Sequence, residues 1–350
     1  MKINSNLAFF NSLINPLNFS EPLLLNGFTD KTKLLDLLRQ MKLIRFVEKK
    51  LADERKDNVI QGPVHLGAGQ EAIPVGISTN LKKTDRVFGA HRSHSHVLAL
   101  GSDVFKLFSE VLGRDSGLSK GMGGSMHLWD QPNGFYGSVP IVSGTVPLAV
   151  GAALAAKLQK TQDIAVAYFG DGAIEEGVVH ESFNLARITN APILFVVENN
   201  LFASHMHISL RQPQNTLSRF AVANNIPYEI LDGNDVVQMS LASKSLIEKT
   251  RKGSGPCFIE AITYRWYGHV DWREDVDVGV SRSQEDILNW KKRDPILRLT
   301  NALLAKGICT SLNIKSLDSE LNVLIEKAWQ KALISPYPDK SSLISRVYAN

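Results

Sequence analysis

Cysteine is scarce in this chain, with only Cys257 and Cys309 among its 350 residues. This scarcity argues against a disulfide framework and against a cysteine metal site. It fits a reducing compartment, so we expect the cytoplasm or an organelle matrix. No apolar run reaches the length of a membrane span, and we therefore expect no membrane insertion. A dense basic stripe is also missing at a formal net charge of +4, so nucleic acid is not an expected partner.

The composition is that of an ordinary globular protein, at 44% hydrophobic and 21% charged residues. No internal repeat and no long linker divides the chain, so we expect a single domain over residues 31–350. Residues 1–30 differ, because Lys2 and Glu21 are the only charges between Met1 and Gly27. This extension lacks the features of a secretory signal or a transit peptide. We expect it either to be poorly ordered or to dock on a partner subunit.

Apolar patterning predicts strands that alternate with helices. The predicted helices cover 31–55, 70–80, 104–112, 147–160, 285–290 and 319–332, and the predicted strands cover 164–169, 193–197, 228–231 and 256–264. Such alternation is typical of a doubly wound, mostly parallel sheet flanked by helices, so we expect an α/β fold with helical additions at both ends.

One segment, from Gly170 to Asn200, carries the strongest chemical signal. A predicted strand ends in Gly170-Asp171-Gly172, a helix follows, and the next strand ends in Glu198-Asn199-Asn200. Open α/β sheets bind ligands at the carboxyl ends of their strands, so a carboxylate and an amide should meet there. One carboxylate with neutral oxygens suits a hard cation, such as magnesium that already carries phosphate oxygens.

Four further clusters of polar residues lie far apart in the sequence. They are His65-Leu66-Gly67-Ala68-Gly69-Gln70-Glu71, Ala90-His91-Arg92-Ser93-His94-Ser95-His96, Lys120-Gly121-Met122-Gly123-Gly124-Ser125-Met126-His127 and Tyr264-Arg265-Trp266-Tyr267-Gly268-His269. With the Gly-Asp-Gly to Asn-Asn segment, they resemble the alpha subunit of the heterotetrameric thiamine-diphosphate-dependent 2-oxo acid dehydrogenases. That family includes the pyruvate, branched-chain 2-oxo acid and acetoin enzymes. The resemblance runs from Lys31 to Asn350.

The resemblance implies thiamine diphosphate and Mg²⁺ as cofactors and assigns a role to each matching residue. Asp171, Asn200 and the carbonyl of Phe202 would hold the metal ion. His65 and His269 would be catalytic. The cofactor would be bound by His91, Arg92, Pro140, Val142, Asp171, Gly172, Ala173, Asn200, Phe202 and His269, with Arg265 a weaker candidate on the phosphate side.

The resemblance also implies partners and a substrate class. A beta subunit would supply the aminopyrimidine half of the site in an α2β2 assembly, and a lipoyl acyltransferase component would accept the acyl group. The substrate would be a small 2-oxo acid, with pyruvate favoured. Phe202, Ser204 and His205 are candidate pocket contributors. His127 and His180 are expected to serve packing and loop order, and Glu181 is expected to support the subunit interface or the glycine turn.

Other functions are less well supported by the sequence. Acetoin cleavage or a carboligase reaction would use the same cofactor, and a non-catalytic scaffold would not need the intact site residues. A nicotinamide dehydrogenase is disfavoured because no Gly-x-Gly-x-x-Gly opens a helix after a first strand. Zinc binding by His91, His94 and His96 is also disfavoured, since their spacing does not converge from one helix face.

Overall fold

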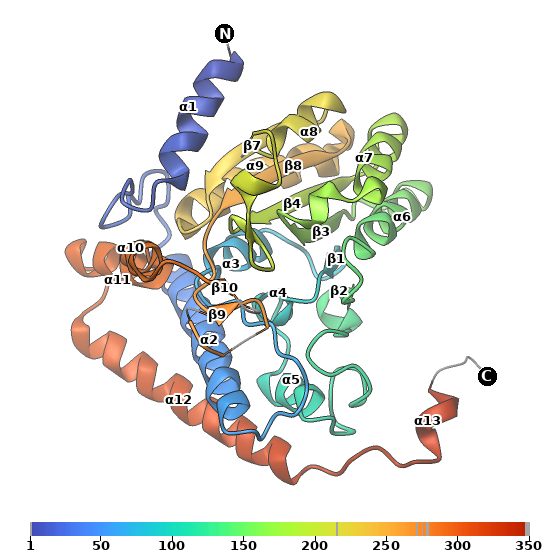
Figure 1. The fold of residues 1–350 in the computed structure, drawn as a ribbon, viewed down its shortest axis with the longest axis vertical. Coiled ribbons are helices and arrows are strands. Elements are labelled where there is room, and N and C mark those ends of the chain that lie inside the picture. Colours follow the sequence, from blue (N-terminus) through green and yellow to red (C-terminus); the bar gives the residue numbers. More distant parts are fainter. Residues whose placement is uncertain (1, 215, 271, 275, 278–279, 347–350) are drawn as a thin grey trace.

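A six-stranded parallel sheet forms the centre of the computed structural model, which describes residues 2–214, 216–270, 272–274, 276–277 and 280–346. Its strands are β1 (Arg86–Gly89), β2 (Phe135–Ser138), β3 (Ala165–Gly170), β4 (Ile193–Asn199), β7 (Tyr228–Asp232) and β8 (Cys257–Ile262). They lie in the order β2-β1-β3-β4-β8-β7, and every neighbouring pair is parallel (Figure 1). The predicted α/β class is confirmed.

The central strands are apolar because both faces of the sheet are covered, as is usual for parallel sheets. Successive side chains of a strand point to opposite faces. In β3, Ala167 and Phe169 therefore join one buried cluster, whereas Val166 and Tyr168 join the other.

Helices pack on both faces, which confirms the doubly wound arrangement. One face carries α6 (Thr145–Leu158), α7 (Gly177–Thr189) and α8 (Ser218–Ala223). The other carries α2 (Lys31–Lys56), α3 (Ala72–Ser78), α4 (His94–Ala99), α5 (Val104–Val111), α9 (Val236–Lys249), α11 (Pro295–Ala305) and α12 (Ser311–Ile334). Figure 1 shows α12 running along the outside of α2 and α5.

Smaller elements complete the chain. They are α1 (Lys2–Ile14), α10 (Gln284–Lys292), α13 (Ser342–Ser345) and the antiparallel pairs β5 (Phe202–Ala203) with β6 (Met206–His207) and β9 (Val276–Asp277) with β10 (Val280–Ser281). Within the described ranges, no helix is long and apolar enough to cross a bilayer.

The predicted helices are present, with some boundaries displaced. The helix expected from residue 319 begins at Ser311, where Thr310 and Asn313 form a reciprocal cap. The helix expected from Pro147 begins at Thr145. Sequence patterning missed β1, β2, α4 and α11, of which β1, β2 and α4 span only four to six residues. Such short elements give too few positions for a periodicity to emerge.

The N-terminal extension contacts its own chain. Phe10 and Leu13 of α1 are buried, and both belong to the apolar cluster on the sheet face that carries α6, α7 and α8. Arg293 donates a hydrogen bond to the carbonyl of Leu13 at 2.6 Å, and Arg298 donates one to the carbonyl of Ser20 at 2.9 Å. The two expectations for residues 1–30, disorder or docking on a partner subunit, remain predictions.

Candidate active site

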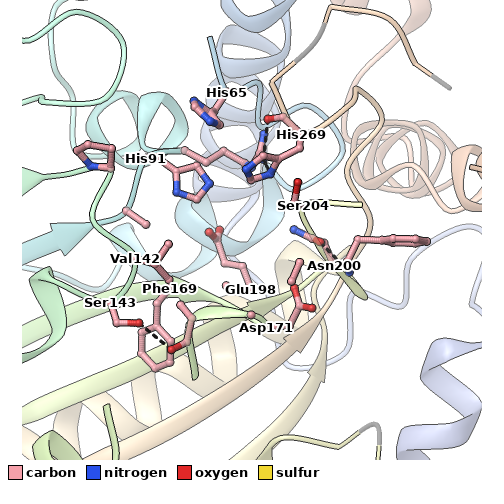
Figure 2. Close-up of a pocket in the computed structure, with 18 of the residues that line it drawn as sticks. His65, His91, Val142, Ser143, Phe169, Asp171, Glu198, Asn200, Ser204 and His269 are labelled. Atoms are coloured by element: carbon pink, nitrogen blue, oxygen red, sulfur yellow. Dashed lines mark hydrogen bonds between the residues drawn. The ribbon is translucent and has the colours of Figure 1, made fainter. Parts of the chain in front are cut away.

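A cavity of about 340 Å³ lies at the carboxyl ends of β1, β3 and β4. Its size is within the range of small-molecule sites. All the residues that the sequence assigned to catalysis, cofactor or metal line this one cavity: His65, His91, Arg92, Pro140, Val142, Asp171, Gly172, Ala173, Asn200, Phe202 and His269. Figure 2 shows the three histidines at one side of the cavity and the pair of Asp171 and Asn200 at the strand ends opposite. The assigned roles themselves remain predictions.

Parallel pairing of β3 with β4 brings Asp171 and Asn200 together. Gly170 is in register with Glu198, so both side chains leave neighbouring strand ends just beyond that pair. Both are buried, and Asp171 is only 1% exposed. The Asn200 side-chain oxygen accepts a hydrogen bond from the backbone N–H of Phe202 at 3.2 Å, and its amide nitrogen donates to Gln70 at 3.4 Å. These contacts fix the amide in the cavity (Figure 2).

Gly172 is required by a close approach of the following loop. A Cβ added at Gly172 would lie 2.5 Å from Cβ of Ala203, a separation that real side chains do not tolerate. The loop therefore packs directly on the Gly-Asp-Gly turn, and a larger residue at position 172 would push Phe202 and its carbonyl away from Asp171.

One expectation about this turn is corrected. The sequence predicted a helix directly after Gly172, but α7 begins only at Gly177. A single 3-10 turn, Ala173–Glu175, lies between them. Glu176 has extended backbone angles, which break the helix, and the carbonyl of Ala173 accepts a hydrogen bond from Ser143 at 2.7 Å. Gly172, Ala173 and Glu175 line the cavity, whereas Gly177 at the start of α7 does not.

Three imidazoles gather at the other side of the cavity. The ring centroids of His65, His91 and His269 are 4.5 to 5.2 Å apart, with edge-on contacts. Arg92 lies beside them and donates hydrogen bonds to the carbonyl of Leu66 at 2.5 Å and to that of His269 at 3.2 Å. Among the described residues, Nδ1 of His65 has no hydrogen-bond partner.

Burial and a neighbouring positive charge keep these imidazoles neutral. Burial, followed by the charge of Arg92, lowers the pKa of His65 far below its usual value. The same two causes lower the pKa of His91 to about 3 and that of His269 to about 2. A neutral imidazole can accept a proton, and it can also bind a metal or donate one hydrogen bond.

This electrostatic environment predicts acid sensitivity. The unfolded chain protonates His91 near pH 6.5 and the folded chain only near 3, so the stability from neutral His91 is complete above 6.5 and declines as pH falls. Between pH 7 and 5.5, the wild type should lose about 1 kcal/mol more unfolding free energy than His91→Gln. Urea unfolding at both pH values measures the difference. His127→Gln, at an exposed histidine, is the control and should behave like the wild type. Equal losses in His91→Gln and the wild type would contradict a neutral His91.

The zinc arrangement that the sequence disfavoured does not form. His94 and His96 lie on α4 and turn away from His91. His94 contacts Glu48 at 3.3 Å and Ser125 at 2.8 Å, and His96 contacts Glu198 at 3.3 Å. The two histidines therefore belong to separate buried networks.

Several residues near the site were misjudged or missed. Arg265 does not line the cavity; its guanidinium donates to the carbonyls of Ser204 and Tyr267. Ser204 lines the cavity, whereas His205 does not. The missed lining residues that carry polar side chains are Gln70, Ser143, Glu175 and Glu198. Glu198 directly precedes the two asparagines in the Glu-Asn-Asn motif, so its position could have identified it as a cavity residue.

Comparison with known proteins assigns the family. The dehydrogenase E1 component family matches residues 39–341. The chain belongs to the dehydrogenase E1 component family. Dehydrogenase E1 components are enzymes, and membership implies thiamine diphosphate as the cofactor of this site.

Curated relatives of this E1 chain carry two kinds of name. The alpha subunit of acetoin:2,6-dichlorophenolindophenol oxidoreductase from Bacillus subtilis is 35% identical over 91% of this chain and 94% of its own length. The pyruvate dehydrogenase E1 component subunit alpha from Rhizobium meliloti is 35% identical over 89% of each chain, and that from Rickettsia felis is 32% identical over 91% and 96%.

The residues of this E1 site fit a diphosphate that carries a metal ion. Burial raises the pKa of the Asp171 carboxyl, and the charge of Arg211 opposes that rise. A carboxylate so deeply buried needs a cationic partner. Gly172 and Ala173 line the cavity on the side of the glycine turn, and Arg92 lines it on the side of the histidines with a guanidinium that suits phosphate oxygens.

Proposed function

We propose that this chain is the alpha subunit of a thiamine-diphosphate- and Mg²⁺-dependent 2-oxo acid dehydrogenase component, with pyruvate as the favoured substrate. One observation carries the proposal: a single cavity holds the pair of Asp171 and Asn200 at one side and Arg92 with three neutral histidines at the other. The family membership supports the cofactor, and the set of oxygen ligands supports the metal ion.

Oxygen ligands alone are available at the strand ends, and magnesium prefers such ligands. The carboxylate of Asp171, the amide oxygen of Asn200 and the carbonyl of Phe202 would bind the ion. Water and diphosphate oxygens would complete its coordination. Because Asp171 is the only charged member of this set, it should contribute most of the affinity.

The diphosphate would lie between the glycine turn and Arg92. Gly172 and Ala173 would offer backbone N–H groups, and Arg92 would offer a forked guanidinium, which matches phosphate oxygens well. His91 and His269 are neutral and would donate single hydrogen bonds. Pro140 and Val142 provide an apolar wall on which the aminopyrimidine end can pack.

Thiamine diphosphate supplies an electron sink for decarboxylation when it is bound. The chain's own contribution to the reaction would be proton handling and orientation. His65 and His269 remain neutral at ordinary pH and line the cavity, so each ring offers a lone pair and an N–H to the reacting groups.

A beta subunit is the proposed partner, in an α2β2 assembly that delivers the acyl group to a lipoyl acyltransferase component. Apolar side chains next to the cavity support a protein partner there. Ile141 is 71% exposed, and Val142 and Leu148 are 48% and 57% exposed. Val142 also lines the cavity, so a subunit that covered this surface would contact the cofactor site.

The proposal is tested by co-expressing the chain with its beta subunit and supplying pyruvate or acetoin with thiamine diphosphate, Mg²⁺ and a lipoyl domain. We expect pyruvate decarboxylation with acylation of the lipoyl group, and loss of turnover on removing Mg²⁺ with a chelator. Acetoin cleavage without pyruvate turnover would favour the second candidate, which the Bacillus subtilis relative supports at 35% identity. A new carbon–carbon bond without lipoyl acylation would contradict both.

A further inference from the structure

Arg211 reaches the proposed metal ligand from outside the cavity. Its guanidinium donates one hydrogen bond to Oδ2 of Asp171 and another to Glu175. The side chain is only 8% exposed. Arg211 does not itself line the cavity, although Asp171 and Glu175 do. The guanidinium therefore contacts these carboxylates from the side that faces away from the cavity.

The same side chain also holds the loop that contains Phe202. Nε of Arg211 donates to the carbonyl of Met206 at 3.2 Å. Met206 pairs with Ala203 across the β5–β6 hairpin, and Ala203 is the residue that packs on Gly172. Arg211 thus joins three parts of the site: the carboxylate of Asp171, the turn at Glu175 and the hairpin that begins with Phe202.

We propose that Arg211 is a positioning residue for the metal site, which fixes the loop that carries the Phe202 carbonyl against the turn that carries Asp171. This inference rests on the proposed function, since it concerns the same ion. The contact to Arg211 uses Oδ2 of Asp171, and no hydrogen bond from another side chain engages Oδ1 within the described part of the chain. Groups that orient a metal ligand in this way commonly contribute tenfold to hundredfold in metal affinity.

A competing outcome has the opposite sign. If Arg211 only replaced the ion as the counter-charge of Asp171, its removal would strengthen cation binding, because the ion would no longer have to displace it. If Arg211 orients Asp171 and the hairpin, its removal weakens binding. The direction of the change in affinity therefore decides between the two.

Mn²⁺ is a suitable probe, because oxygen-rich octahedral sites accept it in place of Mg²⁺. Binding of Mn²⁺ to the chain assembled with its beta partner is measured by electron paramagnetic resonance with saturating thiamine diphosphate. We expect Arg211→Gln to bind Mn²⁺ at least tenfold more weakly than the wild type. Thiamine diphosphate affinity at saturating Mn²⁺ should change less than threefold. Arg211→Lys keeps the charge but lacks the planar fork, so its Mn²⁺ affinity should lie between those of the wild type and Arg211→Gln.

Arg219→Gln is the matched control. Arg219 lies in the same segment and donates to Gln212, Gln214 and Thr216, but not to a carboxylate. Arg219→Gln should bind Mn²⁺ like the wild type. Weaker Mn²⁺ binding in both Arg211→Gln and Arg219→Gln would indicate a general loosening of this segment and would overturn the proposal.

Wild-type or tighter Mn²⁺ binding in folded Arg211→Gln would also overturn the positioning role. If Arg211→Gln does not fold, Arg211→Lys decides: affinity at least threefold below the wild type supports the role, and unchanged affinity overturns it. Failure of the proposed function looks different, because the wild-type chain itself would then show no Mn²⁺ binding that depends on thiamine diphosphate.

Discussion

Asp171→Ala is expected to abolish cation-dependent binding of thiamine diphosphate, with affinity reduced on the order of 100-fold or more. Asp171 is the only carboxylate among the three proposed ligands, and it is almost fully buried. The two remaining ligands are neutral oxygens of Asn200 and Phe202, which cannot balance the charge of the ion. A hundredfold loss corresponds to about 2.7 kcal/mol of binding free energy.

Calorimetry of thiamine diphosphate binding at saturating Mg²⁺, with the beta partner present, measures this loss. Asp171→Asn is a second variant, because it preserves the shape of the side chain and limits the damage from leaving Arg211 without this partner. Glu181→Ala is the control; Glu181 lies on α7 and is exposed, so its removal should leave binding unchanged. Unaltered affinity in folded Asp171→Ala would refute the metal site.

Arg92→Ala tests the binding of the diphosphate separately from the binding of the metal ion. Its guanidinium lies on the wall opposite the strand ends, beside His269. Thiamine diphosphate should bind more weakly in Arg92→Ala, yet its binding should still depend on Mg²⁺. Loss of the metal dependence alone would contradict the assignment of Arg92 to the phosphates.

The pair of Asp171 and Asn200 could be predicted from sequence because parallel strands end at the same edge of a sheet. The segment from Ile164 to Asn200 contains both strands and the connecting helix, so local patterning was enough to place the two side chains at neighbouring strand ends. The alternation of strands and helices in the same patterning also predicted the α/β fold class. It could not give the order of strands, since β1 and β2 are four residues each and carry no distinctive pattern.

Residues that reach the site across long loops could not be predicted. Gln70 contacts Asn200 over 130 positions, and Arg211 contacts Asp171 over 40. Gln70 lies in the 65–71 cluster, but the sequence does not show which residue it contacts, and Arg211 belongs to no motif; both contacts depend on where a loop packs in three dimensions. The histidines of the 91–96 cluster show the same limit: only His91 enters the cavity, because α4 directs His94 and His96 toward buried glutamates on other elements.

His65→Gln is expected to lower turnover of the 2-oxo acid by about 100- to 10,000-fold, the usual contribution of a positioned acid–base group. His65 is buried, lines the cavity and has no hydrogen-bond partner for Nδ1 among the described residues. Its strongly lowered pKa keeps the ring neutral over the working pH range, so the ring offers both a lone pair and an N–H to the reacting groups. The same property excludes a standing positive charge that would anchor a substrate carboxylate.

Turnover of the complete enzyme with pyruvate, and calorimetry of thiamine diphosphate binding, together measure this role. Cofactor affinity should change less than the turnover does, because the proposed metal and diphosphate ligands are other residues. His180→Gln is the control; His180 lies on α7 against Phe220, outside the cavity. A raised KM with unchanged kcat in His65→Gln would mean that His65 binds substrate and transition state equally. Such a result would assign His65 to substrate binding and leave His269 as the remaining candidate for proton transfer.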